Sequence, residues 1–81
     1  MPEATEGEPS PEARILQRER ERDVEAALAR LSDKLRDVVV LRYSAGAGYE
    51  EIAATLAIPV GTVKRRLFDA VEKLRRLLEA T

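Results

Sequence analysis

The residues with the greatest capacity for chemistry lie in one short stretch near the end of the sequence. They combine a hydroxyl group, three consecutive cations, an aromatic ring and a carboxylate: Thr62, Lys64, Arg65, Arg66, Phe68 and Asp69. Cations and hydroxyls of this kind hold phosphate oxygens, while arginine, aromatic and carboxylate side chains contact base edges. The stretch therefore indicates nucleic-acid binding, although a solvated cationic patch with no such role would have the same composition.

The rest of the sequence offers little catalytic chemistry. The 81 residues include no Cys and no His, which argues against thiol chemistry, disulfides, imidazole bases and the usual zinc sites. The serines at positions 10, 32 and 44 have no base near them in the sequence. We therefore expect no enzymatic activity, no metal and no cofactor.

A long amphipathic helix, about Val60–Glu79, is needed to hold the cationic stretch on one surface. Apolar residues recur there at helical spacing: Val63, Leu67, Ala70, Val71, Leu74, Leu77 and Leu78. At 100° per residue the opposite face carries Gly61, Thr62, Arg65, Phe68, Asp69 and Glu72, flanked by Lys64 and Arg66. We expect the flanking cations and Thr62 to contact phosphates and the central residues to reach bases. For Phe68 the alternative is packing against a neighbouring helix.

A shorter helix, about Tyr49–Leu56, precedes the long one and completes a helix-turn-helix. Its Ile52 points inward. Ala57 stands where glycine usually adopts a left-handed conformation, which would cost alanine about 1 kcal/mol if its φ is positive. Ile58 is expected to pack into the core, and Pro59 fixes the backbone that leads into the next helix.

Two more helices are predicted in the first half of the sequence, which makes the fold an all-α, four-helix bundle. The first runs over about Pro11–Leu31, with proline in its first turn and an apolar stripe formed by Val24, Ala27, Leu28 and Leu31. Ser32 is the expected N-cap of the second, which continues to about Ser44. Gly46 then serves as a C-cap in the loop 45–48.

Residues 1–10 are expected to form a flexible acidic tail or linker, because they carry Pro and Glu and few apolar side chains. Residues 11–81 then make up the single domain. Ile15 and Leu16 form a second, weaker apolar patch near its start. That patch is either a surface for a partner or plain packing.

The charge is unevenly distributed along the sequence. The net charge is −1, yet residues 60–81 carry six bases and three acids while residues 1–31 carry five bases and eight acids. Phosphate binding depends on the local field, so the basic end is compatible with DNA, with modest affinity. No apolar run approaches the ~20 residues that span a bilayer, so a cytoplasmic protein with no membrane contact is expected.

These motifs resemble region 4 of the bacterial sigma factors of the extracytoplasmic-function (ECF) group. The similarity covers about two thirds of the chain, in the segments Glu25–Leu31, Leu35–Tyr43, Tyr49–Leu56, Ile58–Lys64 and Arg66–Leu67 together with Gly46. It implies a winged-helix-like, four-helix domain that binds the −35 promoter element in the major groove. It also implies docking on core RNA polymerase through the flap tip of the β subunit, and an anti-sigma factor as a further partner.

By position in the family, Lys64, Arg65, Phe68 and Asp69 face DNA, and Arg42 touches the DNA backbone. Three positions depart from the family pattern. Serine commonly stands where this chain has Arg65 and Gly48, and arginine commonly stands where it has Asp69. Without the serine cap, the helix after Gly48 is expected to fray.

Asp69 is open to several interpretations. Its carboxylate can accept from a cytosine amino group, pair with Arg65 or Lys73 on its own helix, or repel phosphate. The promoter sequence that the chain reads is therefore left open.

Nothing in the sequence corresponds to sigma region 2, so the chain is either an excised domain, which we favour, or a stand-alone relative of region 4. Two other functions fit parts of the pattern. One is the DNA-binding output domain of a LuxR-type response regulator, against which Pro59 and the segment Leu41–Tyr43 count. The other is a protein-interaction module that binds RNA polymerase or an anti-sigma factor without reading DNA.

Overall fold

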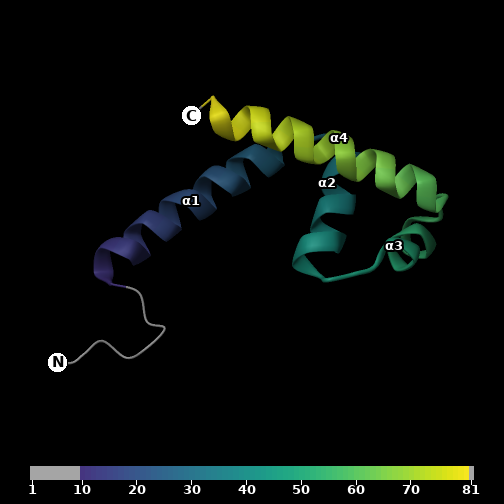
Figure 1. Cartoon of the computed structure of the whole chain (residues 1–81), viewed down its shortest axis with the longest axis horizontal. Helices are drawn as coiled ribbons and strands as arrows, with labels where there is room; N and C mark the ends of the chain where they lie inside the picture. The colour runs from purple at the N-terminus through teal and green to yellow at the C-terminus, as the bar shows by residue number, and fades with distance from the viewer. Residues whose placement is uncertain (1–9, 81) are drawn as a thin grey trace.

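The computed structural model describes residues 10–80, and every regular element in that range is helical. In chain order they are α1 (Pro11–Ala29), α2 (Asp33–Val39), the π-helical turn η1 (Val40–Ser44), α3 (Tyr49–Leu56) and α4 (Val60–Glu79) (Figure 1). The predicted all-α architecture with a helix-turn-helix is confirmed. The acidic tail predicted for residues 1–10 lies outside the described residues, apart from Ser10.

The first helix begins as the sequence predicts. The Ser10 hydroxyl accepts a hydrogen bond from the backbone N–H of Ala13 at 3.1 Å, and Pro11 occupies the first turn. Only the last turns of α1 are covered, since Ala27 is buried whereas residues 10–26 are exposed. The outer half of α1 therefore projects away from the cluster formed by the other helices (Figure 1).

The predicted end of this helix at Leu31 is two residues too late. The N–H of Arg30 bonds to the carbonyl oxygen of Ala27 and the N–H of Leu31 bonds to that of Leu28, which closes the helix after Ala29. Leu31 still belongs to the core, with only 4% of its surface exposed. Its place in the apolar core was predicted correctly, but it enters the core from the connection between α1 and α2 rather than from α1 itself.

The second helix has the predicted N-cap and the predicted extent, but its last turn is not α-helical. The Ser32 hydroxyl accepts from the N–H of Leu35 at 3.3 Å. From Val40 the chain widens into η1, where the N–H of Ala45 bonds to the Val40 carbonyl five residues earlier, at 3.1 Å. Gly46 follows with φ of 72°, a left-handed conformation that suits the predicted C-cap glycine.

The two helices of the helix-turn-helix have the predicted bounds. The expected fraying after Gly48 is not seen, because the Glu51 carboxylate accepts from the Gly48 N–H at 2.8 Å and takes up one free donor. Ala57 does adopt the left-handed conformation, with φ of 58° and ψ of 46°. The next N–H, of Ile58, bonds to the Ala53 carbonyl at 3.0 Å and closes α3.

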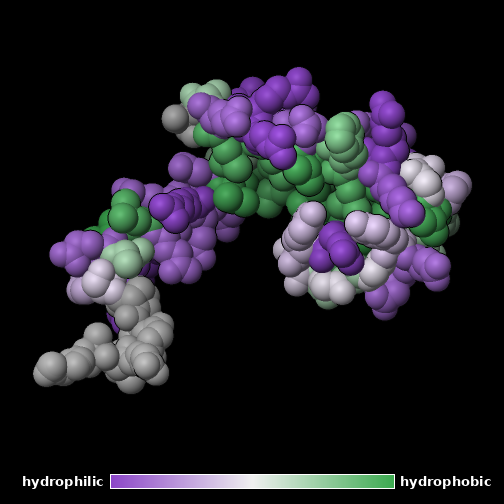
Figure 2. Space-filling view, in the orientation of Figure 1, coloured by the Kyte–Doolittle hydropathy of each residue, from purple (hydrophilic) through white to green (hydrophobic). Residues whose placement is uncertain are grey.

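The core lies where α4 passes over α2 and α3. Its buried residues are Leu31, Val38, Val39, Ile52, Ala53, Val63, Leu67 and Ala70, with Ile58 and Leu74 among the partly buried residues packed against them. Helix α4 contacts α1, α2 and α3, so it is the common support of the bundle. Figure 2 shows a band of hydrophobic residues along the underside of α4, between more hydrophilic residues on either side. Within residues 10–80 no helix has both the length and the apolar content to cross a membrane.

Candidate nucleic-acid interface

Helix α4 places the cationic stretch on the side opposite its core face. Val63, Leu67 and Ala70 are buried, and the side chains between them point outward. Lys64, Arg65 and Phe68 are exposed, while Thr62, Arg66 and Asp69 are half-buried. The six residues predicted on this helix therefore lie along its exposed front and the flanks of that front.

Phe68 does not pack into the bundle. Its side chain is 64% exposed, so the alternative of packing against a neighbouring helix is wrong. An aromatic side chain left in solvent beside cations is available to an external apolar group, such as a thymine methyl.

Two cations of the interface share one aromatic ring. The guanidinium carbon of Arg42 lies 4.6 Å from the centre of the Tyr49 ring, and the Lys64 ammonium lies 5.8 Å from it. Arg42 also donates from Nη1 to the Ala47 carbonyl oxygen at 3.1 Å. Arg42, from η1, is thus brought next to Lys64, from α4, by a residue at the start of α3.

Tyr49 was not predicted as part of the candidate interface, because the sequence pattern marked it only as the start of a helix. The ring contributes about 0.5–1 kcal/mol per exposed cation contact and limits where each cation can move. The sequence does place Arg42 and Tyr49 on either side of a short glycine loop, which could have suggested a contact between them. That contact, however, depends on the widened turn of η1. Nothing in the spacing alone predicts it.

A hollow of about 380 Å³ lies beside these cations. Its lining mixes aromatic, aliphatic and cationic side chains: Tyr43, Tyr49, Lys64, Leu67, Phe68 and Val71. Tyr43 is 67% exposed and, like Phe68, offers a ring to the solvent. Rings next to a lysine suit a nucleic-acid surface, which presents apolar and anionic groups together.

Asp69 pairs with Arg65, one turn earlier on the same helix. The Arg65 Nε lies 3.3 Å from Asp69 Oδ2, and the two side chains are 78% and 43% exposed. Among the intrahelical partners considered for Asp69, the structure thus selects Arg65 rather than Lys73. The pair lies in the middle of the outward face and lowers its net positive charge.

The start of α4 is open to an external acceptor. Its N-cap residue is Pro59, and no side chain caps the helix. A β-carbon built at Gly61 would meet nothing within 4 Å, so no contact inside the protein requires a glycine there. Free N–H groups and the positive end of the helix dipole favour an anion such as a phosphate at this position.

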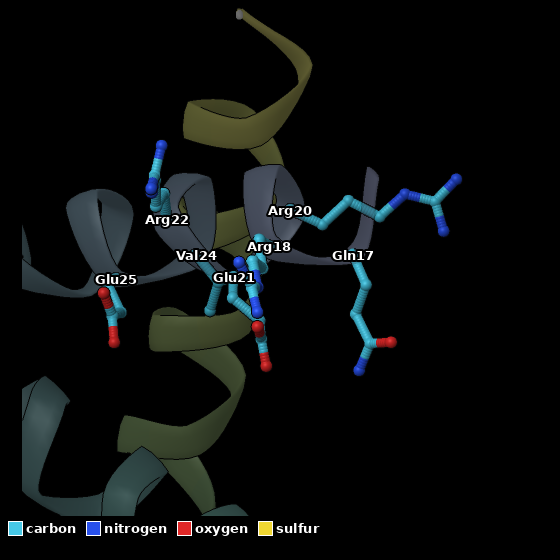
Figure 3. Close-up of a pocket in the computed structure, with 7 residues that line it drawn as sticks. All are labelled: Gln17, Arg18, Arg20, Glu21, Arg22, Val24 and Glu25. Atoms are coloured by element: carbon cyan, nitrogen blue, oxygen red, sulfur yellow. The ribbon is translucent and has the colours of Figure 1, made fainter. Parts of the chain in front are cut away.

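A second hollow, on α1, does not form a comparable site. It has a volume of about 560 Å³ and lies along α1, lined by Gln17, Arg18, Arg20, Glu21, Arg22, Val24 and Glu25. Figure 3 shows Arg22 pointing upward, Arg20 to the right, and Gln17 and Glu25 downward, so these side chains do not converge on a common centre. The described residues also include no cluster of acidic side chains able to hold a metal.

Comparison with known proteins identifies the family. Residues 27–76, which include all of the candidate interface residues, match the family described as Sigma-70, region 4. The chain belongs to this family. The resemblance seen in the sequence is thus confirmed, and the sigma interpretation is favoured over that of a LuxR-type response regulator.

Curated relatives agree with this assignment. The chain is 39% identical over 70 residues to the RNA polymerase sigma-H factor of Pseudomonas aeruginosa, which covers 86% of this chain and 36% of that protein. It is 36% identical over 70 residues to the ECF RNA polymerase sigma-E factor of Haemophilus influenzae, covering 86% of this chain and 37% of the relative. It is 38% identical over 68 residues to the ECF RNA polymerase sigma factor SigW of Bacillus subtilis, covering 84% of this chain and 36% of the relative. The region 4 chain therefore spans about a third of the length of these relatives.

Proposed function

We propose that this chain recognises the −35 element of promoters as the region 4 domain of an ECF sigma factor. The observation that carries the proposal is the division of α4 into a buried apolar face and an outward face bearing Lys64, Arg65 and Phe68. A helix of this kind, held by a preceding short helix, fits the major groove of B-DNA.

Different residues have different tasks in this proposal. Thr62, Lys64 and Arg66 on α4, with Arg42 on η1, hold phosphates and set the orientation of the helix on the duplex. Arg65, Phe68 and Asp69 face the base edges. The uncapped start of α4 accepts a further phosphate, and Gly61 allows that phosphate to come close to the backbone.

The proposal extends to partners. Names of the relatives as RNA polymerase sigma factors support binding to core RNA polymerase, with the flap tip of the β subunit as the contact. An anti-sigma factor is a second protein partner, and a cytoplasmic location follows because promoter DNA and polymerase are there. No catalytic step is assigned to this chain.

Selection from a random pool of duplexes, with and without core polymerase, tests whether the chain reads DNA. We expect one enriched sequence, bound more tightly than a scrambled duplex of equal composition. Failure to enrich any sequence under either condition would contradict the proposal. Binding to polymerase without any DNA preference would instead favour the protein-interaction alternative.

Lys64→Ala tests the phosphate-binding part. The variant should weaken matched and scrambled duplexes to a similar degree, and should lower the slope of log affinity against log salt by about 1. Fluorescence anisotropy over a salt series measures both quantities. Lys34→Ala removes an exposed lysine from the first turn of α2 and should leave the slope unchanged.

A further inference from the structure

The pairing of Arg65 with Asp69 has a specific consequence for how the arginine presents its donors. A guanidinium group has two donor edges: one is formed by Nε and one terminal nitrogen, and the other by the two terminal nitrogens Nη1 and Nη2. Asp69 accepts from Nε at 3.3 Å. Within residues 10–80 this is the one hydrogen bond of the Arg65 side chain, so both terminal nitrogens remain available.

The free edge matches one base in the major groove. Guanine presents two acceptors there, N7 and O6, spaced for two parallel N–H donors, whereas adenine replaces O6 with an amino donor. A carboxylate on Nε fixes the plane of the guanidinium and lowers the entropy lost when both donors bind. Because the Arg65–Asp69 pair is close to neutral, it contributes little to the attraction of phosphates. Its main contribution is to the discrimination between bases.

We propose that Asp69 positions Arg65 to read a single guanine through Nη1 and Nη2. The inference rests on the proposed function, since it names the base that the same face reads. Arg65 is the contacting residue and Asp69 a positioning residue. It resolves the open question about Asp69 in favour of an indirect role, through Arg65, over direct capture of a cytosine amino group.

Three variants separate orientation from charge. Asp69→Ala removes both the charge and the acceptor, and Asp69→Asn removes the charge but keeps a carbonyl acceptor for Nε. Glu72→Ala is the matched control, because Glu72 is a similarly exposed carboxylate on α4 that pairs with Arg75 instead, at 3.2 Å. All these side chains lie at least partly in solvent, and circular dichroism verifies that each variant is folded.

The experiment measures dissociation constants for the duplex enriched by selection and for versions changed at one guanine. For the wild-type chain, replacing the guanine with adenine should weaken binding about 5- to 150-fold. Replacing it with 7-deazaguanine, which lacks the N7 acceptor, should cause part of that loss. The preference for guanine over adenine should fall at least about threefold in Asp69→Ala and disappear in Arg65→Ala. It should largely survive in Asp69→Asn and be unchanged in Glu72→Ala.

The outcomes distinguish this inference from the function on which it rests. A guanine preference that Asp69→Ala leaves intact, or a selected sequence with no guanine sensitive to Arg65→Ala, would overturn the inference while leaving promoter reading in place. Equal gains in affinity for all duplexes in Asp69→Ala and Glu72→Ala, without a change in preference, would reduce Asp69 to a repulsive charge and also overturn it. No binding to any duplex, with or without polymerase, would overturn the proposed function itself.

Discussion

Tyr49 links two positively charged side chains that come from different helices. Its ring lies within 4.6 Å of the Arg42 guanidinium and 5.8 Å of the Lys64 ammonium. Such contacts restrict long, mobile cations before any ligand arrives, so less conformational entropy is lost on binding. A residue that carries no charge can therefore influence phosphate binding through its neighbours.

Tyr49→Leu tests this role. The substitution keeps an apolar side chain but removes the ring, so we expect affinity for matched and scrambled duplexes to fall by roughly 2- to 5-fold. The salt slope should not change, because no charge is lost. Tyr43→Leu is the control, since Tyr43 lines the same hollow. An equal loss in the control would show that the apolar surface of the hollow matters rather than the cation contacts.

Gly61 provides a second test at the level of a single residue. Its surroundings are empty in the free protein, so alanine fits and should raise the free energy of unfolding by up to about 1 kcal/mol. In the complex the added methyl group would approach the phosphate backbone. We expect Gly61→Ala to be more stable in urea denaturation yet to bind DNA more weakly. Unchanged affinity would exclude a close backbone approach at this position.

The turn between α3 and α4 holds a strained residue at the centre of the helix-turn-helix. Ala57 adopts φ of 58°, which an L-residue with a side chain populates at a cost of about 1 kcal/mol. The helix-turn-helix therefore forms because the packing of α3 and α4 compensates for an unfavourable turn residue.

Ala57→Gly should relieve this strain. Part of the gain is offset by the greater freedom of glycine in the unfolded chain, so the free energy of unfolding should rise by about 0.5 kcal/mol. Gly46→Ala should have the opposite effect and lower it by about 1 kcal/mol, because Gly46 has φ of 72°. Urea denaturation measures both. A loss of stability in Ala57→Gly would mean that the methyl group contributes packing that outweighs the strain.

The helices were predictable where local chemistry alone determines them. Pro11 in the first turn, the serine cap at Ser32 and the alternation of apolar and charged residues in 60–79 indicated the helix starts and faces correctly. The bounds of the two motif helices followed from Pro59 and the turn before it. Caps and apolar periodicity involve residues only a few positions apart, so both can be recognised from the sequence alone.

Features that depend on contacts between distant residues were not predictable. The π-helical turn over Val40–Ser44 has no distinctive composition, and the four apolar residues from Val38 to Leu41 fit an α-helix equally well. The stacking of Arg42 and Lys64 on Tyr49 follows from that turn. For Asp69 the sequence left several partners open because Arg65 and Lys73 both lie four residues away, and the choice depends on side-chain conformation.

At the scale of the whole molecule, one helix combines a structural task with the proposed binding task. Helix α4 supplies Val63, Leu67 and Ala70 to the core and carries the interface on its other side. A domain of this size has a small core, so loss of one central side chain affects the helix that carries the candidate interface.

Ile52→Ala is the test of this coupling. Ile52 is fully buried, and truncating it should cost about 2–5 kcal/mol, a large fraction of the stability of a small domain. We expect a lower melting temperature that rises again when the selected duplex is added in excess, since binding stabilises the folded state. A melting temperature unaffected by the duplex, at concentrations that saturate the wild type, would show that the variant folds into a form that no longer binds.

The widened turn at the end of the second helix has a consequence for how the chain tolerates changes in length. A π-helical hydrogen bond joins residues five apart, whereas an α-helical hydrogen bond joins residues four apart. The segment Val40–Ser44 therefore holds one residue more than an α-helical turn needs. Deleting one residue there lets the turn relax into ordinary α geometry while the flanking helices keep their register. The same deletion between Val63 and Leu67 would rotate every later side chain of α4 by about 100° and turn the apolar face of that part of the helix toward the solvent.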